Sequence, residues 1–182
     1  MPNTYYFYKG ESRSSIICRM RKDMLEYINP LWKKRDLSLP FNSKEEAIIL
    51  ASIVEKETSL ASERALIAGV FLNRLKLNMK LQSDPTVSYG LNMRDAKGLT
   101  RKHLQTHTPY NTYTNKGLPI APIANPGKAS LYAVFHPAKT DYLYFVADGS
   151  GGHKFSKTLE EHNKNVANWR KLQSSKVSNN TK

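Results

Sequence analysis

Apolar residues recur every three to four positions along much of this chain, which is the pattern of helices that bury one face. One helix is predicted from about Ser14 to Trp32, and its apolar face is made by Ile16, Ile17, Met20, Met24, Leu25 and Ile28. A second is predicted over Glu45–Thr58, with Asn42 or Ser43 as its candidate N-cap. A third runs from about Ser62 to Leu77, with apolar positions Leu66, Ile67, Val70, Phe71 and Leu75.

The helix over Glu45–Thr58 carries a carboxylate on its apolar face. At roughly 100° per residue, Ile53, Val54 and Glu57 share one stripe, whereas Glu55 and Lys56 point away from it. Burial of a carboxyl group raises its pKa, and a raised pKa suits a general acid near neutral pH. The alternative is an ordinary glutamate whose stem packs while its head reaches water or a basic partner.

The character of the chain changes between residues 80 and 126. This segment is polar, turn-forming and aromatic, and its prolines exclude helix interiors. A segment of this length without regular structure is typical of a functional loop or of disorder, and its Tyr and Leu content argues against disorder. We therefore expect it to form a binding surface.

The C-terminal third combines helices with one hairpin. A helix is predicted from Gly127 to Phe135, with Asn125 as N-cap and Pro126 at its first position. A strand at 142–146, a turn at 148–152 and a return at 153–156 form a hairpin, and a last helix begins near Ser156 and uses Leu159, Val166, Trp169 and Leu172. The fold class is therefore α+β: a mainly helical domain with a small antiparallel β-hairpin and long ordered loops. We expect an N-terminal segment at 1–40, a main domain at 41–175 and a flexible tail at 176–182.

The net charge of this chain limits the classes of possible partner but does not identify one. At 182 residues, a net charge of +13 and a pI near 9.8 indicate anionic surroundings, which include nucleic acid, phospholipid and anionic wall polymers. The helix after Ser62 offers mainly Ala, Leu, Val and Phe instead of base-reading side chains, so no nucleic-acid partner is expected. Cys18 is the only cysteine, and the histidines lack metal-ligand spacing, so no metal and no cofactor are expected.

Seven ordered motifs give this chain a specific family resemblance. It resembles the MltG/YceG-type endolytic murein transglycosylases over essentially Pro2 to Trp169. The motifs are Ala51-Ser-Ile-Val-Glu-Lys-Glu-Thr58, Gln82-Ser-Asp-Pro-Thr-Val87, Tyr110-Asn-Thr-Tyr113, Gly117-Leu-Pro119, His136-Pro-Ala138, Tyr142-Leu-Tyr-Phe-Val146 and Gly151-Gly-His-Lys-Phe155.

The resemblance implies a lyase of bacterial cell-wall biogenesis. Such an enzyme cuts nascent peptidoglycan glycan strands between MurNAc and GlcNAc without water and leaves 1,6-anhydroMurNAc ends. The catalytic glutamate of the family matches Glu57, which would act first as acid and then as base. The implied partners are glycan strands and, as candidates, peptidoglycan synthases. The implied location is the periplasmic face of the bacterial inner membrane.

The sequence departs from this family at its N-terminal end. Family members usually carry a membrane anchor and a LysM-like region before the catalytic part. No run here approaches the roughly 20 apolar residues of a membrane helix, and no signal peptide precedes the aromatic-rich start. We expect the chain to represent the catalytic part, with any membrane contact made through a missing anchor.

Polar and aromatic side chains of the motifs are the candidates for binding the sugar. Those expected to hydrogen-bond it are Gln82, Ser83, Thr86 and, toward the N-acetyl group, Asn111. Those expected to stack on sugar faces or to orient Glu57 are Tyr89, Tyr110 and Tyr113, for which simple packing is the alternative. His153 is expected either to border the cleft or to make a structural hydrogen bond.

Asp84 decides between two kinds of chemistry. An aspartate before proline most often hydrogen-bonds a local turn, and this is our prediction for Asp84 beside its possible contact with substrate. If Asp84 instead faced Glu57, two carboxylates would be present and ordinary hydrolysis would become feasible.

Two functions of a different class stay open on the sequence. One is a non-catalytic peptidoglycan-binding or assembly module of the cell-wall machinery. The second is a pyridoxal-phosphate lyase, although the sequence shows no Gly-rich phosphate cradle with a suitable lysine. Glycan retention without turnover would indicate the first, and absorbance of a bound cofactor would indicate the second.

Overall fold

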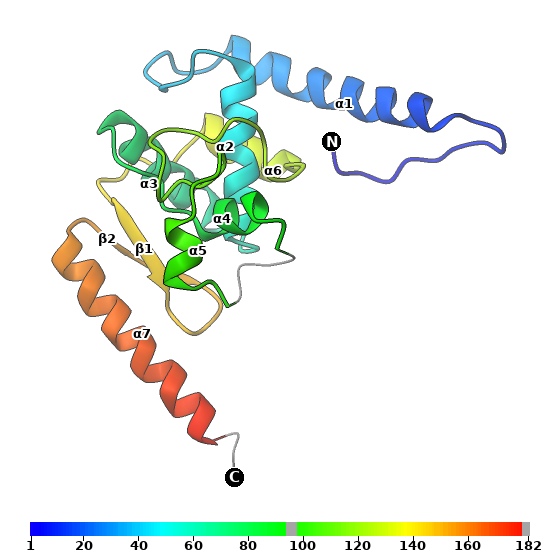
Figure 1. Ribbon diagram of the computed structural model, residues 1–182. Coiled ribbons are helices and arrows are strands. Elements are labelled where there is room, and N and C mark those ends of the chain that lie inside the picture. The colour runs from blue at the N-terminus through cyan, green and yellow to red at the C-terminus, as the bar shows by residue number, and fades with distance from the viewer. Residues whose placement is uncertain (94–97, 180–182) are drawn as a thin grey trace.

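The computed structural model describes residues 1–93 and 98–179 and confirms a mainly helical α+β fold. Figure 1 shows α2, α3, α4 and α6 gathered into one body, with α1 projecting from it and the hairpin lying beside α7. In chain order the elements are α1 (Arg13–Lys33), α2 (Lys44–Glu57), α3 (Arg64–Lys76), α4 (Asp84–Gly90), α5 (Arg101–Gln105), α6 (Lys128–Phe135), β1 (Tyr144–Ala147), β2 (His153–Ser156) and α7 (Leu159–Asn179).

Helix α1 forms where the apolar period predicts it, but its apolar face is covered unevenly. Ser12 is the N-cap, and its hydroxyl accepts a hydrogen bond from the backbone N of Ser15 at 3.1 Å. Ile28 is completely buried in the main core, whereas Ile17 is 63% exposed. The spacing of apolar residues therefore predicted that α1 is a helix, but it did not predict which part of its apolar face is buried.

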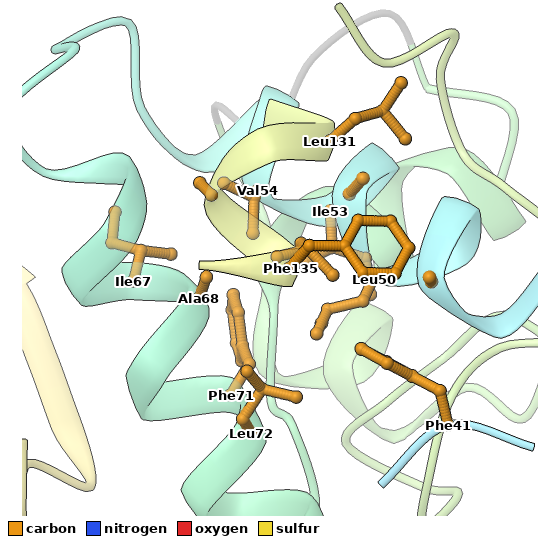
Figure 2. Packing of buried hydrophobic residues seen from close by; sticks show 14 of the residues in the cluster. Phe41, Leu50, Ile53, Val54, Ile67, Ala68, Phe71, Leu72, Leu131 and Phe135 are labelled. Carbon is orange, nitrogen blue, oxygen red and sulfur yellow. The ribbon is translucent and has the colours of Figure 1, made fainter. Parts of the chain in front are cut away.

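The core is built from α2, α3 and α6, which pack against one another. Almost every residue from Ala47 to Val54 is buried, so α2 is the central helix of the three. Figure 2 shows Leu50 and Ile53 of α2 in one cluster with Phe71 of α3 and Leu131 of α6. Full burial of one such side chain contributes roughly 1.5–3 kcal/mol, so this cluster fixes the path of α2 to its last turn.

The N-terminus of α2 is defined by two side chains. Ser43 is the N-cap, and its hydroxyl accepts from the backbone N of Glu46 at 3.2 Å. The carboxylate of Glu46 in turn accepts from the backbone N of Asn42 at 2.7 Å. Of the two candidate caps, Ser43 is therefore confirmed, and Asn42 lies one position before it.

The predicted start of α6 is wrong. Its N-cap is Gly127, not Asn125, and Pro126 lies before the helix. Glycine offers no side chain to cap the helix, and a carboxylate of α2, that of Glu55, instead binds the backbone N–H of the N-cap residue. Its Oε2 accepts from the backbone N of Gly127 at 3.0 Å and from the hydroxyl of Ser130 at 2.6 Å. A negative charge at a helix N-terminus is stabilising, so Glu55 joins α2 to α6.

The prediction that residues 80–126 lack helices is also wrong. The short helices α4 and α5 lie in this segment, while residues 94–97 of it fall outside the described part. Pro85 sits in the first turn of α4, where a missing backbone N–H removes no helical hydrogen bond. Thr100 caps α5, and its hydroxyl accepts from the backbone N of His103 at 3.3 Å.

The hairpin is confirmed. Strands β1 and β2 are antiparallel, with a register that runs from Tyr144 opposite Ser156 to Ala147 opposite His153. In the turn between them, the carboxylate of Asp148 accepts from the backbone N of Ser150 at 2.7 Å. This turn contains glycines with left-handed backbone angles, which fit the tight reversal.

Helix α7 packs on the two strands and reaches the C-terminal end of the described chain (Figure 1). It continues to Asn179, which is inside the segment 176–182 where we expect a flexible tail, and residues 180–182 lie outside the described part. Although α1 and α7 each have 21 residues, both are rich in charge. Among the described residues, no helix is both long and apolar enough to span a membrane.

Candidate active site

A cleft of about 560 Å³ lies between the helical core and the hairpin with α7. On the core side, the polar groups lining it are Glu57, Arg74, Gln82, Asp84 and Tyr113. The opposite side consists of β1, His153 and one face of α7 with Leu159, His162, Asn163, Val166 and Trp169. The last residue of α2 and the loop before α4 therefore face a second surface made by a distant part of the chain.

Glu57 occupies the position in this cleft that its place on the apolar stripe predicts. It ends α2, one turn beyond the buried Ile53 and Val54, and it is only partly exposed. Burial raises its pKa from 4.5 to about 7, and the nearby charge of Asp84 also raises it. A hydrogen bond from the hydroxyl of Ser83, at 2.5 Å to Oε1, acts in the opposite direction.

A buried network holds Ser83 in place. Its backbone N donates to the hydroxyl of Thr112 at 3.0 Å, and that hydroxyl lies 2.8 Å from the hydroxyl of Thr86. Thr86 is completely buried, so it exposes no surface to the cleft, and its hydroxyl instead donates to the carbonyl of Ser83 and lies beside Thr112. Gln82 does line the cleft, and it adopts a left-handed backbone angle, with φ of 50°.

Asp84 does not make the local turn bond that we expect. Its Oδ1 accepts from the phenol of Tyr113 at 2.6 Å, 29 residues further along the chain. Both residues line the cleft together with Glu57. Burial, followed by the contact with Asp84, raises the pKa of Tyr113, so the phenol keeps its proton at neutral pH. The cleft therefore holds two carboxyl groups and one fixed phenol donor.

Arg74 is the site residue that sequence reasoning missed. It is only 6% exposed, and its Nε donates to the carbonyl of Leu143 at 2.6 Å, while Nη1 donates to the carbonyl of Leu81 at 2.8 Å. Its positive charge lowers the pKa of Glu57, against the larger effect of burial. Its spacing from Ile67 and Phe71 places it on the buried face of α3, and this was a readable signal for a buried cation.

Three other predicted binding residues lie away from the lining of this cleft. Tyr89 and Tyr110 pack against each other with ring centroids 4.8 Å apart. Asn111 is completely buried, and its amide donates to the carbonyls of Leu104 at 3.0 Å and Thr106 at 2.7 Å. The two rings thus pack on each other, although Tyr89 stays 46% exposed, and the buried amide of Asn111 is held by its own loop.

His153 combines both of its predicted roles. It lines the cleft, and its Nδ1 lies 2.7 Å from Oε2 of Glu63, whose other oxygen accepts from the backbone N of His153. The hydroxyl of Thr58, next to Glu57, donates to the same carboxylate at 3.2 Å. These contacts with His153 lower the pKa of Glu63 and join the hairpin to the end of α2.

This arrangement suits proton transfer near neutral pH. With a pKa of about 7, Glu57 is available both as an acid and as a base. Asp84 supplies a second carboxyl group in the same cleft, and Tyr113 a hydrogen-bond donor. In the described part of the chain, no cluster of three or more His, Cys, Asp or Glu side chains could hold a metal ion.

Known proteins match nearly the whole of this chain. The model of the YceG-like family matches residues 1–168. An endolytic murein transglycosylase of Bacillus subtilis is 43% identical over 164 residues, which are 90% of this chain and 45% of that protein. A protein of the same name from Streptococcus pneumoniae is 33% identical over 177 residues, which are 91% of this chain and 31% of that protein.

A solved structure agrees with these matches. The crystal structure of a yceG-like protein from Listeria monocytogenes superposes with a TM-score of 0.76 at 43% identity, over 87% of this chain and 52% of that one. The chain thus spans about half or less of the length of these relatives. Because the family model matches residues 1–168, this chain belongs to the YceG-like family.

Proposed function

We propose that this chain is the catalytic part of an endolytic peptidoglycan lytic transglycosylase, with Glu57 as its acid and base. The main support for this proposal is the carboxyl group of Glu57, which has a pKa of about 7 and lies in an open cleft beside hydrogen-bonding and aromatic side chains. The names of the relatives from Bacillus subtilis and Streptococcus pneumoniae support murein as the substrate.

In the proposed reaction one carboxyl group serves two proton transfers. Glu57 donates its proton to the oxygen that links C1 of MurNAc to GlcNAc, and the C1–O bond breaks as oxocarbenium character develops. The C6 hydroxyl of the same MurNAc then attacks C1, and its proton passes to the Glu57 carboxylate. The products are a 1,6-anhydroMurNAc end and a free GlcNAc hydroxyl, with the proton returned to Glu57. Proton transfer of this kind accelerates a reaction about 10²–10⁴-fold.

The neighbours of Glu57 have separate proposed roles. Ser83 orients the carboxyl group through its 2.5 Å hydrogen bond. The Asp84 carboxylate, held by Tyr113, stabilises positive charge that develops at C1 and keeps the pKa of Glu57 high. Gln82 and His153 remain the candidates from the predicted set for direct hydrogen bonds to the sugar.

Product mass tests this proposal. The protein is incubated with uncrosslinked glycan strands, and the fragments are weighed by mass spectrometry. We expect anhydro ends, and we expect Glu57→Gln to abolish them. Glu45→Gln is the matched control, because it makes the same change at an exposed position of α2. Turnover that survives in Glu57→Gln would contradict the assignment.

Hydrolysis is the second candidate reaction, and the presence of Asp84 in the same cleft favours it. A hydrolase would use Asp84 as base or nucleophile and would add one water to each cut, giving reducing ends instead of anhydro ends. The same mass measurement therefore separates the two. Retention of glycan without any turnover, unchanged in Glu57→Gln, would instead identify a non-catalytic peptidoglycan-binding module.

The division of the chain and the cellular location of the complete protein are also proposals. We place catalysis in residues 41–175, with residues 1–40 as an N-terminal segment. We further propose that the complete protein works on nascent strands at the outer face of the cytoplasmic membrane, near peptidoglycan synthases. Detecting the complete protein in that membrane fraction, and crosslinking it to a synthase, would test this placement.

A further inference from the structure

One face of α7 forms a continuous strip along the cleft. The residues that line it are Leu159, His162, Asn163, Val166 and Trp169, which recur at intervals of three to four positions. At about 1.5 Å per residue, this strip extends roughly 15 Å along the helix axis. The lining of the cleft therefore reaches well beyond the immediate surroundings of Glu57.

A row of stacked side chains leads from Arg74 to His162, near the N-terminal end of this strip. The guanidinium of Arg74, whose charge acts on Glu57, lies 5.1 Å from the ring centroid of Tyr144. The ring of Tyr144 stacks on His162, with centroids 5.2 Å apart and an angle of 26° between the planes. Trp169 lies two helical turns after His162, roughly 10 Å further along the helix axis, so the cleft wall extends well beyond the row that begins at Arg74.

Two polar or aromatic groups of the strip are left uncommitted by the fold. Within the described residues, the indole of Trp169 stacks on no other aromatic ring, and its N–H has no hydrogen-bond partner. The amide of Asn163 is exposed and likewise makes no hydrogen bond to the described part of the chain. Asn163 and Trp169 lie six residues apart on α7, roughly 9 Å along its axis, and both line the cleft. An aromatic face and a free amide along one wall suit a glycan strand, whose rings have an apolar C–H face and polar groups at the edge.

We propose that Trp169 and Asn163 form a saccharide-binding subsite on the α7 wall of the cleft, in which the indole stacks on a sugar ring outside the disaccharide that is cut. Asn163 binds the hydroxyl or N-acetyl group at the edge of a neighbouring sugar. The subsite rests on the proposed function, because it assumes that the cleft takes a glycan strand. It gives this enzyme a preference for longer strands, since binding energy from remote sugars supports the reaction at Glu57.

Fluorescence tests the contact directly. The chain has two tryptophans, so Glu57→Gln combined with Trp32→Phe leaves Trp169 as the only indole and stops turnover. We expect uncrosslinked glycan oligosaccharides to change the emission of Trp169 saturably and to protect it from acrylamide quenching. Short fragments that span only the bond to be cut are expected to do neither. Calorimetry on the same samples measures binding independently, so oligosaccharide binding without any change at Trp169 would overturn the subsite.

Steady-state kinetics test whether the subsite gives a preference for longer strands. For Trp169→Ala we expect kcat/KM to fall about three- to tenfold on long strands, the range of one aromatic stack, and to change little on the shortest cleavable fragments. Trp169→Phe should recover much of this loss, and Arg170→Ala, at the exposed neighbouring position, should cause none. Circular dichroism establishes that each variant is folded. Equal losses on long and short strands would overturn the subsite.

The two proposals fail in different ways. If the parent chain cuts strands while Trp169 neither reports binding nor affects the length preference, the subsite is refuted and the proposed function stands. If Trp169 reports saturable glycan binding while the parent chain cuts nothing, the proposed reaction is refuted and the subsite stands.

Discussion

Glu57→Gln is expected to make the protein more stable than the parent chain at pH 8 and not at pH 4. In the parent, burial raises the pKa of Glu57 from 4.5 to about 7. Between these two values the folded state binds more protons than the unfolded state, so the free energy of unfolding falls as pH rises. Above pH 7 the folded state carries the full cost of the buried charge, which glutamine avoids.

The magnitude follows from the same two values. At about 1.36 kcal/mol per pH unit, the interval from 4.5 to about 7 corresponds to about 3 kcal/mol. This is an upper limit, because Glu57 is partly exposed and solvent screens some of the charge. Glutamine keeps an oxygen that accepts the hydrogen bond from Ser83, so this contact does not confound the comparison.

Urea unfolding at pH 4, 6 and 8 measures the effect. We expect the difference in unfolding free energy between Glu57→Gln and the parent to grow with pH, mainly between pH 5 and pH 7.5. Glu45→Gln, at an exposed position of α2, is the control and should show no comparable trend. A difference that stays constant from pH 4 to pH 8 would refute the raised pKa, and with it the physical basis for Glu57 as an acid.

Other perturbations test separate parts of the structure. Asp84→Asn removes a charge that raises the pKa of Glu57, so the alkaline limb of kcat/KM on glycan strands should move to lower pH; an unmoved limb would contradict this coupling. Glu55→Gln weakens the cap of α6 and should lower the unfolding free energy by about 1–2 kcal/mol in urea titrations, whereas a neutral result would show that the cap is dispensable. Gly69→Ala places a Cβ 2.7 Å from the carbonyl oxygen of Ala138, and the overpacking should cost about 1–3 kcal/mol, seen as a lower Tm.

The parts of the fold that the sequence predicted depend on short-range periodicity. The helices α2 and α3 and the hairpin were found because their apolar spacing is set by the local backbone. The partial burial of the Glu57 carboxyl group was predictable for the same reason, since its position on the stripe of α2 decides which way it points. Where the prediction failed, a distant group had taken over a local role. Gly127 caps α6 only because Glu55 supplies the missing acceptor from 72 residues away.

Polar side chains were harder to assign, because polarity alone does not say whether a group binds substrate or its own backbone. Thr86 and Asn111 belong to a recognisable motif set, yet both are completely buried and hydrogen-bonded within the chain. Asp84 was expected to close a local turn, and its partner proved to be Tyr113. Each of these outcomes depends on how residues 80–93 and 98–126 fold, and the sequence there has no periodicity to reveal which segments meet.

The two sides of the cleft meet at Arg74, and these contacts explain why a cation is buried near the carboxyl group of Glu57. Its Nε holds the carbonyl of Leu143, at the start of the hairpin, and Nη1 holds the carbonyl of Leu81, in the loop that carries Ser83. The planar guanidinium carries five N–H donors in a fixed fork, which lets one side chain reach both carbonyls. The positive charge that comes with this double contact lowers the pKa of Glu57, and burial together with Asp84 outweighs it. The acid strength of Glu57 is therefore a balance, in which Arg74 sets the geometry of the cleft and Asp84 offsets its charge.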